Sequence, residues 1–290
     1  MSFSSNSPRV SIIMNCFNGE KFLHQSLDSI IQQTYKNWEL IFWDVSTSDK
    51  SKKILEEYKE KRFKYFNIGV KKNLYNSRNE AIEVSNGELI AFLDCDDWWH
   101  KEKLEKQIKL FEDESVAMVY SGYFEYHQHK NKFKKISTSK IFSGYIQSKI
   151  IHDYHIGILT TLIRKKVFHE IRGYNNFFHI CGDFEFNIRM SENNKIIGLK
   201  EFLAYYRIHK ENISRDIDKE IIELEYCYEI FKKKGLKNLK KFENFLNYRK
   251  FKNSLKKNNR KIALEMFLKL DFGFLKFKAL ILFCLGSLIR

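Results

Sequence analysis

The sequence is poor in the residues that punctuate a chain. Its 290 residues include one proline, Pro8, and 12 glycines, which excludes collagen-like and proline-rich classes and leaves few signals for the ends of helices and strands. The five cysteines are scattered and never take the C-x-x-C spacing, so neither a disulfide framework nor a zinc knuckle is indicated and a reducing compartment is expected. Because hydrophobic residues make up 43% of the chain and aromatics 16%, a mostly disordered protein is excluded.

Long apolar runs are also absent. The first ten residues, MSFSSNSPRV, hold no apolar stretch of the kind that signal peptides carry, so we expect a cytoplasmic protein. The longest charge-free apolar run near the C-terminus extends from Ala279 to Ile289. It falls short of the about 20 residues that a membrane-spanning helix needs, so no spanning helix is predicted.

Acidic residues are scarce at the C-terminal end. The chain has 51 Lys and Arg against 36 Asp and Glu, a net charge of 51 − 36 = +15. Residues 231–290 hold 17 basic and 3 acidic residues, so 17 − 3 = +14 of that charge lies there. Apolar residues alternate with the lysines in a helical pattern, which is typical of helices that lie on an anionic membrane. We therefore expect residues 216–290 to hold the protein peripherally at the inner face of the cell membrane.

Short apolar strands alternate with helical patterns over the first 120 residues. Strands are predicted at 10–15, 38–43, 63–68, 89–93 and 116–120, and helices at 22–31, 49–61, 77–84 and 101–111. This alternation predicts an α/β fold with a mostly parallel central sheet flanked by helices. Further along, the pattern predicts a hairpin within 123–145, a strand at 159–163, a helix from Phe184, short strands that end near Arg207, and helices from Lys219 onward.

Polar residues stand where three of these strands end, at Asn15, Asp44 and Asp94. Ligands of open parallel sheets bind beyond these carboxyl ends. The third end continues as Asp94-Cys-Asp96-Asp97, whose carboxylates repel one another unless a cation or hydrogen bonds compensate. Carboxylates suit Mg²⁺ or Mn²⁺, and Mg²⁺ is often shared with substrate phosphates. The run therefore predicts a metal with a diphosphate, the alternative being that Asp96 or Asp97 caps the next helix.

Several segments, in this order, resemble the family 2 glycosyltransferases of the GT-A fold. They are residues 10–20, 27–34, 39–44 with 46–49, 78–79, 87–97 and 182–183. The resemblance covers roughly residues 8–215. It implies a GT-A catalytic domain over residues 1–215, with a nucleotide-sugar-binding half to about residue 120 and an acceptor-side half over 121–215. The helical, basic C-terminal region 216–290 follows as an extension.

The resemblance also implies an activity. It is the inverting transfer of a hexosyl or N-acetylhexosaminyl group from a nucleotide-diphosphate-sugar, with Mn²⁺ or Mg²⁺ at the D-x-D element. A UDP-sugar is the expected donor. A glycan, lipid-linked, is the expected acceptor, as in the synthesis of bacterial-type surface polysaccharide or lipooligosaccharide.

The same resemblance assigns the residues that bind the donor nucleotide. Asn15, Phe17 and Asp44 are expected to hold the nucleobase and ribose, with Phe17 over the face of the base and Asp44 accepting a hydrogen bond from a base N–H. Arg78 is expected near the nucleotide or its diphosphate, where a guanidinium fork suits phosphate oxygens.

The acidic run and a later segment are assigned to the sugar and the metal. Asp94 and Asp96 are expected to face the nucleotide-sugar, and Asp96 and Asp97 to reach the metal. His209 is expected to be a further ligand of the metal, and Arg207 to bind a phosphate.

Asp183 matches the general base of the family, at the start of a helix. The acceptor hydroxyl must lose its proton as it attacks the anomeric carbon, and a single base without a nucleophile gives inversion. The alternative for Asp183 is a helix N-cap. The sequence departs from the family pattern at three positions: Gly182 stands where an acidic residue is common, Tyr75 where a glycine is usual and Val45 where a small polar residue is frequent.

Three other functions stay open. The basic tail would suit a nucleic-acid-binding protein, although no recognition motif accompanies the charge and nucleic acid is not the predicted partner. A nucleotidyltransferase would also need carboxylates and a metal, but no glycine-rich triphosphate loop is found near Asn15. The third is a catalytically inactive relative, which the departures at Gly182 and Tyr75 keep open.

Overall fold

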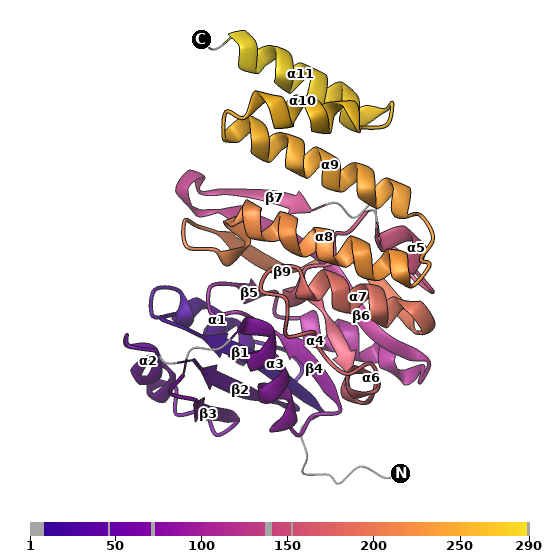
Figure 1. Ribbon diagram of the computed structural model, residues 1–290. Helices are drawn as coiled ribbons and strands as arrows, with labels where there is room; N and C mark the ends of the chain where they lie inside the picture. The colour runs from indigo at the N-terminus through magenta and orange to yellow at the C-terminus, as the bar shows by residue number, and fades with distance from the viewer. Residues whose placement is uncertain (1–8, 46, 71–72, 137–140, 152, 289–290) are drawn as a thin grey trace. The chain divides into compact units, whose positions relative to one another are not determined.

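The structure, a computed structural model, describes residues 9–45, 47–70, 73–136, 141–151 and 153–288 (Figure 1). The chain divides into two compact units. The first comprises Met1–Gln147 and His155–Lys210, and the second Ser148–Tyr154 and Glu211–Arg290.

Over its described residues, the first unit is built on one nine-stranded sheet. The strands are β1 (Val10–Cys16), β2 (Trp38–Asp44), β3 (Phe63–Asn67), β4 (Leu89–Phe92), β5 (Trp98–Trp99), β6 (Val116–His127), β7 (Lys132–Ile136), β8 (Leu162–Arg164) and β9 (Lys195–Ile208). Their order is β3-β2-β1-β4-β8-β6-β9-β5, with β7 paired to β6. The first four strands are parallel, while β8 runs antiparallel to β4 and β6. The α/β class is confirmed, with parallel pairing among β1 to β4 and again between β6 and β9.

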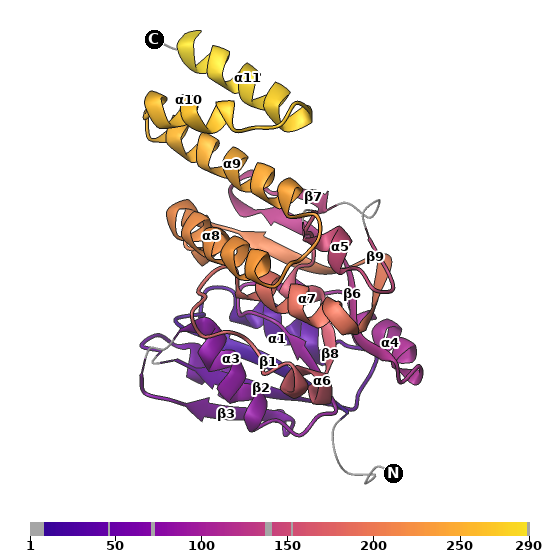
Figure 2. The ribbon, with the colours of Figure 1, turned by 45° about the vertical axis from the view of Figure 1, so that its right-hand side comes forward.

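Helices cover both faces of the parallel strands. The helices of the first unit are α1 (Leu23–Ile31), α2 (Ser51–Glu57), α3 (Leu74–Glu83), α4 (Lys103–Ile108), α6 (Lys165–Glu170) and α7 (Gly182–Asn193), and α5 (Gln147–Ile150) lies at the boundary between the units. Because side chains alternate along a strand, Ala91 and Phe92 point to opposite faces. Ala91 belongs to the buried cluster that includes α1, whereas the guanidinium of Arg78 on α3 lies 5.9 Å from the Phe92 ring centroid. Helix α3 therefore packs on the face opposite α1, against β1 and β2 (Figure 2).

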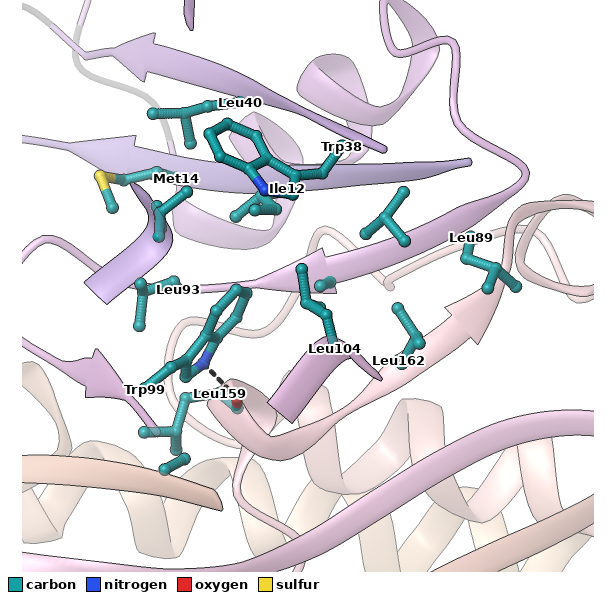
Figure 3. Close-up of a cluster of buried hydrophobic side chains, with 14 of the residues drawn as sticks. Ile12, Met14, Trp38, Leu40, Leu89, Leu93, Trp99, Leu104, Leu159 and Leu162 are labelled. Atoms are coloured by element: carbon teal, nitrogen blue, oxygen red, sulfur yellow. Dashed lines mark hydrogen bonds between the residues drawn. The ribbon is translucent and has the colours of Figure 1, made fainter. Parts of the chain in front are cut away.

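A large apolar cluster lies on the α1 face of the sheet (Figure 3). Alternate residues of the parallel strands, such as Ile12 and Met14, pack there with Trp38 and Leu104. Trp99 of β5 is also buried in this cluster, and its indole N–H donates a hydrogen bond of 2.8 Å to the carbonyl of Leu159. The strand that follows the acidic run is thereby fixed to the core.

The start of β4 is fixed beside β1 by a buried polar cluster. The Ser11 hydroxyl donates to the carboxylate of Glu39 at 2.6 Å, and the N–H of Gly87 donates to the Ser11 hydroxyl at 2.7 Å. The backbone approach at Gly87 is so close that a Cβ there would lie 2.4 Å from the Ser11 nitrogen. Glycine is required at this position because no side chain fits.

Over residues 121–215 two strands differ from the prediction. The strand predicted at 159–163 is β8, which begins only at Leu162, after a short 3-10 helix over Ile158–Thr160. The predicted hairpin is confirmed as the β6–β7 pair, although residues 137–140 of the predicted range lie outside the described residues. In place of the predicted short strands, residues 195–208 form one 14-residue strand, β9. It pairs in parallel with β6 through several register shifts. These shifts break the alternation of side chains between faces, which is the reason that the sequence pattern did not predict a single strand.

The second unit is helical. Its helices are α8 (Ile217–Lys233), α9 (Leu239–Lys256), α10 (Arg260–Leu268) and α11 (Phe274–Leu288). Phe251, Ala263, Met266 and Ala279 form part of a small buried cluster that joins α9, α10 and α11. Among the described residues, no helix combines the length and the apolar character that crossing a bilayer demands.

Candidate active site

The carboxyl ends of β1 and β2 meet at one edge of the sheet. Asn15 pairs with Trp43 and Cys16 with Asp44 in parallel register, and the Val45 N–H donates to the Cys16 carbonyl at 2.8 Å. The Asn15 side chain is 92% buried, with 8% of the residue exposed, and in the described part of the chain neither of its amide atoms has a hydrogen-bond partner. A buried amide without partners is costly, so Asn15 is suited to a ligand that supplies them.

Asp44 and Phe17, which follow the ends of β2 and β1, differ in burial. The Asp44 carboxylate is buried and accepts hydrogen bonds from the Tyr65 hydroxyl at 2.6 Å and from the Thr47 N–H at 2.8 Å. These two bonds fix its orientation. Phe17 directly follows β1 and leaves 47% of its surface exposed, two residues along the chain from the buried amide.

Asp94 is bonded to the arginine that the sequence assigned to the phosphates. One terminal nitrogen of Arg78, on α3, donates to both oxygens of Asp94, at 2.7 and 2.9 Å. Arg78 is 3% exposed. Burial by itself lowers the pKa of Arg78, but the Asp94 carboxylate together with Tyr75 and Tyr174 raises that pKa above its ordinary value. The guanidinium is therefore neutralised within the protein and holds Asp94 in place.

The two following carboxylates have different environments. Asp97 is buried, and burial together with the neighbouring charges of Asp96 and Asp94 raises the pKa of its carboxyl well above the usual range. Its Oδ1 accepts a 2.8 Å hydrogen bond from the Arg207 N–H. Asp96 instead is partly exposed, and its Oδ2 lies 2.8 Å from His209 Nε2.

Pairing between β5 and β9 brings the late segment against the acidic run. Trp98 pairs with Tyr205 in antiparallel register, so Arg207 and His209 lie beside residues 96–97. The Arg207 side chain donates from Nε to the Asp96 carbonyl at 2.8 Å and from a terminal nitrogen to the side chain of Gln25. The predicted residues thus form two bonded sets, Arg78 with Asp94, and Arg207 and His209 with Asp96 and Asp97. A backbone hydrogen bond of 3.2 Å from the Asp97 N–H to the Asp94 carbonyl joins them.

The metal prediction was a three-residue set of Asp96, Asp97 and His209. Among the residues that the structure describes, no three His, Cys, Asp or Glu side chains are arranged to hold a metal ion. Asp96 and His209 lie together, whereas Asp97 turns its carboxylate to the Arg207 backbone. The capping alternative for Asp96 and Asp97 is wrong, because α4 begins at Lys103 and Glu102 occupies its cap position.

Asp183 lies in the first turn of α7. The cap position of this helix is Cys181, so the N-cap alternative for Asp183 is wrong as well. Its Oδ1 accepts a hydrogen bond from the Phe184 N–H at 2.8 Å and lies 3.3 Å from the Tyr75 hydroxyl. Burial raises the pKa of the Asp183 carboxyl. A carboxylate with a raised pKa is a stronger base, as proton abstraction requires.

The nearest carboxylate along α7 has another role. Glu185 is buried, and both of its oxygens bind Arg189, at 2.6 and 2.8 Å. Arg189 also donates from a terminal nitrogen to the Gly173 carbonyl at 2.7 Å. This pair fixes α7 to the preceding segment and leaves Asp183 as the carboxylate of the first turn without a basic partner in the described residues.

Sequence reasoning missed three residues at the site. Gln25 and Phe22, near the start of α1, contact Arg207, and the guanidinium lies 4.4 Å from the Phe22 ring centroid. No local signal marks them, since their partner is about 180 residues away. Tyr75 contacts Asp183, and its departure from the family pattern was a signal that could have identified it.

Comparisons with known proteins identify the family of the chain. Residues 11–172, more than half of the chain, match the family described as Glycosyl transferase family 2. UDP-Glc:alpha-D-GlcNAc-diphosphoundecaprenol beta-1,3-glucosyltransferase WfgD of Escherichia coli is 28% identical over 214 residues, which are 73% of this chain and 82% of the relative. The putative teichuronic acid biosynthesis glycosyltransferase TuaG of Bacillus subtilis is 28% identical over 213 residues, 71% of this chain and 82% of the relative.

Solved structures share the fold. Residues 1–349 of TarS from S. aureus, in complex with UDP-GlcNAc, superpose with a TM-score of 0.69 at 16% identity, covering 91% of this chain and 82% of that one. The mannosyltransferase PcManGT from Pyrobaculum calidifontis, in complex with GDP-Man and Mn²⁺, gives a TM-score of 0.65 at 15% identity, covering 98% of this chain and 81% of that one. The chain therefore belongs to glycosyl transferase family 2 and is a glycosyltransferase of the GT-A fold.

Proposed function

We propose that this chain transfers a hexosyl or N-acetylhexosaminyl group, with inversion, from a UDP-sugar to a lipid-linked glycan. The product would contribute to a surface polysaccharide or lipooligosaccharide. The observation that carries the proposal is the single network around α3. Arg78 of this helix holds Asp94 on the donor side, and Tyr75 of the same helix contacts Asp183. A donor-binding carboxylate and a candidate base are thus held by one rigid element.

In this proposal, Asp183 is the general base. As the acceptor hydroxyl attacks the anomeric carbon, the Asp183 carboxylate takes its proton. Glu185 is occupied by Arg189, so the first turn of α7 offers one carboxylate for this step and none as a nucleophile. One base and a direct displacement by the acceptor give inversion of the anomeric centre.

The donor would lie over the carboxyl ends of β1, β2 and β4. Asn15, with its two unpartnered buried amide atoms, and Asp44 would bind the nucleobase and ribose, and the exposed Phe17 ring would cover the base. Asp94 would bind the ribose in the orientation that Arg78 sets, and Arg207 would face the diphosphate. UDP is favoured over GDP because WfgD is named for UDP-Glc and the TarS structure holds UDP-GlcNAc, although PcManGT holds GDP-Man.

Two of the three predicted metal ligands, Asp96 and His209, lie side by side as the ligands of one divalent ion would. Asp96 and His209 would hold Mn²⁺ or Mg²⁺, with diphosphate oxygens completing the shell, since such ions often keep only one or two protein ligands. The presence of Mn²⁺ in the PcManGT structure supports Mn²⁺. When bound, the ion would stabilise the negative charge that develops on the leaving diphosphate. Asp97 would serve by holding the Arg207 backbone, through which the 207–209 segment stays beside Asp96.

The second unit is proposed to bind the anionic inner face of the membrane, where a lipid-linked acceptor would be met. Leu268, Phe272 and Phe277 are 68%, 98% and 63% exposed. Lys269, and Lys276 and Lys278 on α11, lie in the same stretch of sequence. Each basic residue near an anionic surface contributes about 1 kcal/mol, and exposed aromatic and aliphatic side chains add insertion into the lipid boundary.

Donor turnover tests the enzymatic proposal. UDP- and GDP-sugars would be offered with Mn²⁺ or Mg²⁺ to the intact chain and to its Asp96→Ala and Asp183→Asn variants. We expect metal-dependent turnover of a UDP-sugar that both substitutions abolish. Turnover of GDP-sugars alone would refute the donor assignment, and turnover without added metal in the presence of a chelator would refute the metal assignment.

Vesicle sedimentation tests the membrane proposal. The full chain is expected to sediment with vesicles that contain anionic lipid and not with neutral ones. The double variant Leu268→Ser, Phe272→Ser should bind more weakly than a matched control, Val70→Ser, which removes an exposed apolar side chain from the first unit. Equal binding by all three proteins would contradict the proposal, and binding to duplex DNA in place of vesicles would favour a nucleic-acid partner.

A further inference from the structure

Helix α3 holds the segment that leads into α7. The Asn79 amide donates to the Tyr174 carbonyl at 2.8 Å and accepts from the Tyr174 N–H at 2.9 Å. The Asn73 amide donates to two further carbonyls of the segment, at 3.0 and 2.6 Å. The Tyr75 hydroxyl donates to the Ile180 carbonyl at 2.8 Å. Two side chains of α3 and that of its N-cap residue, Asn73, thus fix the backbone from residue 174 to residue 180, just before Asp183.

Tyr75 is the member of this set that reaches the candidate base. Its side chain is buried, and its hydroxyl oxygen lies 3.3 Å from Asp183 Oδ1 as well as 2.8 Å from the Ile180 carbonyl. The hydroxyl has one proton and two acceptors, both on the short stretch 180–183. It therefore ties the carboxylate and the backbone that carries it to one point of α3.

Gly182 makes room for this tyrosine. A Cβ at Gly182 would lie 2.6 to 2.7 Å from three ring atoms of Tyr75, a distance that requires one of the two to move. The departures at Gly182 and Tyr75 are therefore linked, because the Tyr75 ring occupies the space that a side chain at position 182, next to the base, would need.

We propose that Tyr75 is a positioning residue for the general base, holding the Asp183 carboxylate at a fixed place and in its ionised form. This proposal rests on the proposed function, in which Asp183 takes the acceptor proton. It does not place Tyr75 in contact with the donor or the acceptor. Removing the hydroxyl should therefore slow the proton-transfer step and leave donor binding unchanged.

The charged and titratable groups that face Asp183 come from three directions. They are Tyr75 and Arg78 on α3, Tyr123 on β6, and Tyr174 in the segment before α7. Burial raises the pKa of Asp183, while the Phe184 N–H, Arg78 and Tyr75 act in the opposite direction. Loss of the Tyr75 hydroxyl removes one of these stabilising contacts, so the pKa of Asp183 should rise further.

The experiment uses the full chain with UDP-glucose and UDP-GlcNAc as donors and Mn²⁺, and measures UDP release in the presence of a GlcNAc-diphospholipid acceptor. Tyr75→Phe removes only the hydroxyl. Tyr174→Phe is the matched control, because it removes a buried hydroxyl from a ring 5.2 Å from that of Tyr75. We expect Tyr75→Phe to lower kcat about tenfold, with the donor KM unchanged and the acid limb of the kcat profile moved to higher pH, and the control to show neither effect.

A second variant approaches the same contact from the other side. Gly182→Ala should displace the Tyr75 ring and move the acid limb in the same direction. A Tyr75→Phe protein with wild-type kcat and an unmoved acid limb would overturn the positioning role while leaving the proposed function intact. Absence of donor turnover in the unaltered chain, or full activity of Asp183→Asn, would instead overturn the proposed function and this proposal with it.

Discussion

The buried side chain of Lys103 should make the stability of the first unit depend on pH. The side chain lies on α4 and is fully buried. Its ammonium donates to the Gln107 side chain at 2.8 Å and lies 4.3 Å from the Trp99 ring centroid, and within the described residues no carboxylate forms an ion pair with it. Burial without a counter-charge lowers the pKa of Lys103 well below its usual value.

The magnitude follows from proton linkage. In the unfolded chain the lysine keeps a pKa of about 10.4. Between the lowered folded value and that pH, the unfolded state binds one more proton than the folded state, so the free energy of unfolding rises with pH by up to about 1.4 kcal/mol per unit. The loss of stability caused by burying Lys103 is absent above the pKa of the unfolded chain. It grows as the pH falls and is complete below the pKa of the folded chain. From pH 8 to pH 10 the gain is up to about 2.5 kcal/mol.

The assay is urea unfolding of the wild-type chain and of Lys103→Met between pH 7 and 10. The four tryptophans lie at positions 38, 43, 98 and 99, all in the first unit, so their fluorescence reports that unit. The difference in unfolding free energy between the two proteins should change by up to about 2.5 kcal/mol in favour of the wild type between pH 8 and 10. Lys101→Met, at an exposed position, should show no such change. A pH-independent difference for Lys103→Met would refute the reasoning.

Three further predictions concern the polar network and the metal. Asp94→Ala leaves the buried Arg78 charge unpaired and should lower the free energy of unfolding by about 3–5 kcal/mol in the same assay, a change below 1 kcal/mol being incompatible with the observed pair. Gly87→Ala places a Cβ 2.4 Å from the Ser11 nitrogen and should leave little folded protein by circular dichroism; a wild-type melting curve would contradict it. His209→Ala should raise the Mn²⁺ concentration for half-maximal activity about tenfold or more, and an unchanged value would remove it from the metal site.

Much of the proposed donor site could be predicted, because the positions of its residues depend on the local sequence alone. A polar residue at the end of an apolar strand reaches the carboxyl edge of a parallel sheet, whatever the rest of the chain does. Asn15, Asp44 and Asp94 were identified in this way, and the structure has them at that edge or just beyond it.

The partners of these residues could not be predicted, because they are set by distant packing. Arg78 was expected to bind the phosphates. Because α3 packs on the face of the sheet that carries Phe92, the Arg78 side chain instead donates hydrogen bonds to the Asp94 carboxylate. Asp97 was expected to bind the metal. Its carboxylate instead accepts a hydrogen bond from the backbone N–H of Arg207 on β9, which is 110 residues away in the sequence. The sequence contains both residues of each pair and no signal that joins them.

We propose that Asp183 acts as the protein base of an inverting transfer. The most direct test is the anomeric configuration of the product made from UDP-α-glucose and a GlcNAc-diphospholipid, read by proton NMR for the intact chain and for Asp183→Asn. We expect a β-linked product from the intact chain and no product from the variant. An α-linked product, or a β-linked product formed by Asp183→Asn at the wild-type rate, would contradict the proposal.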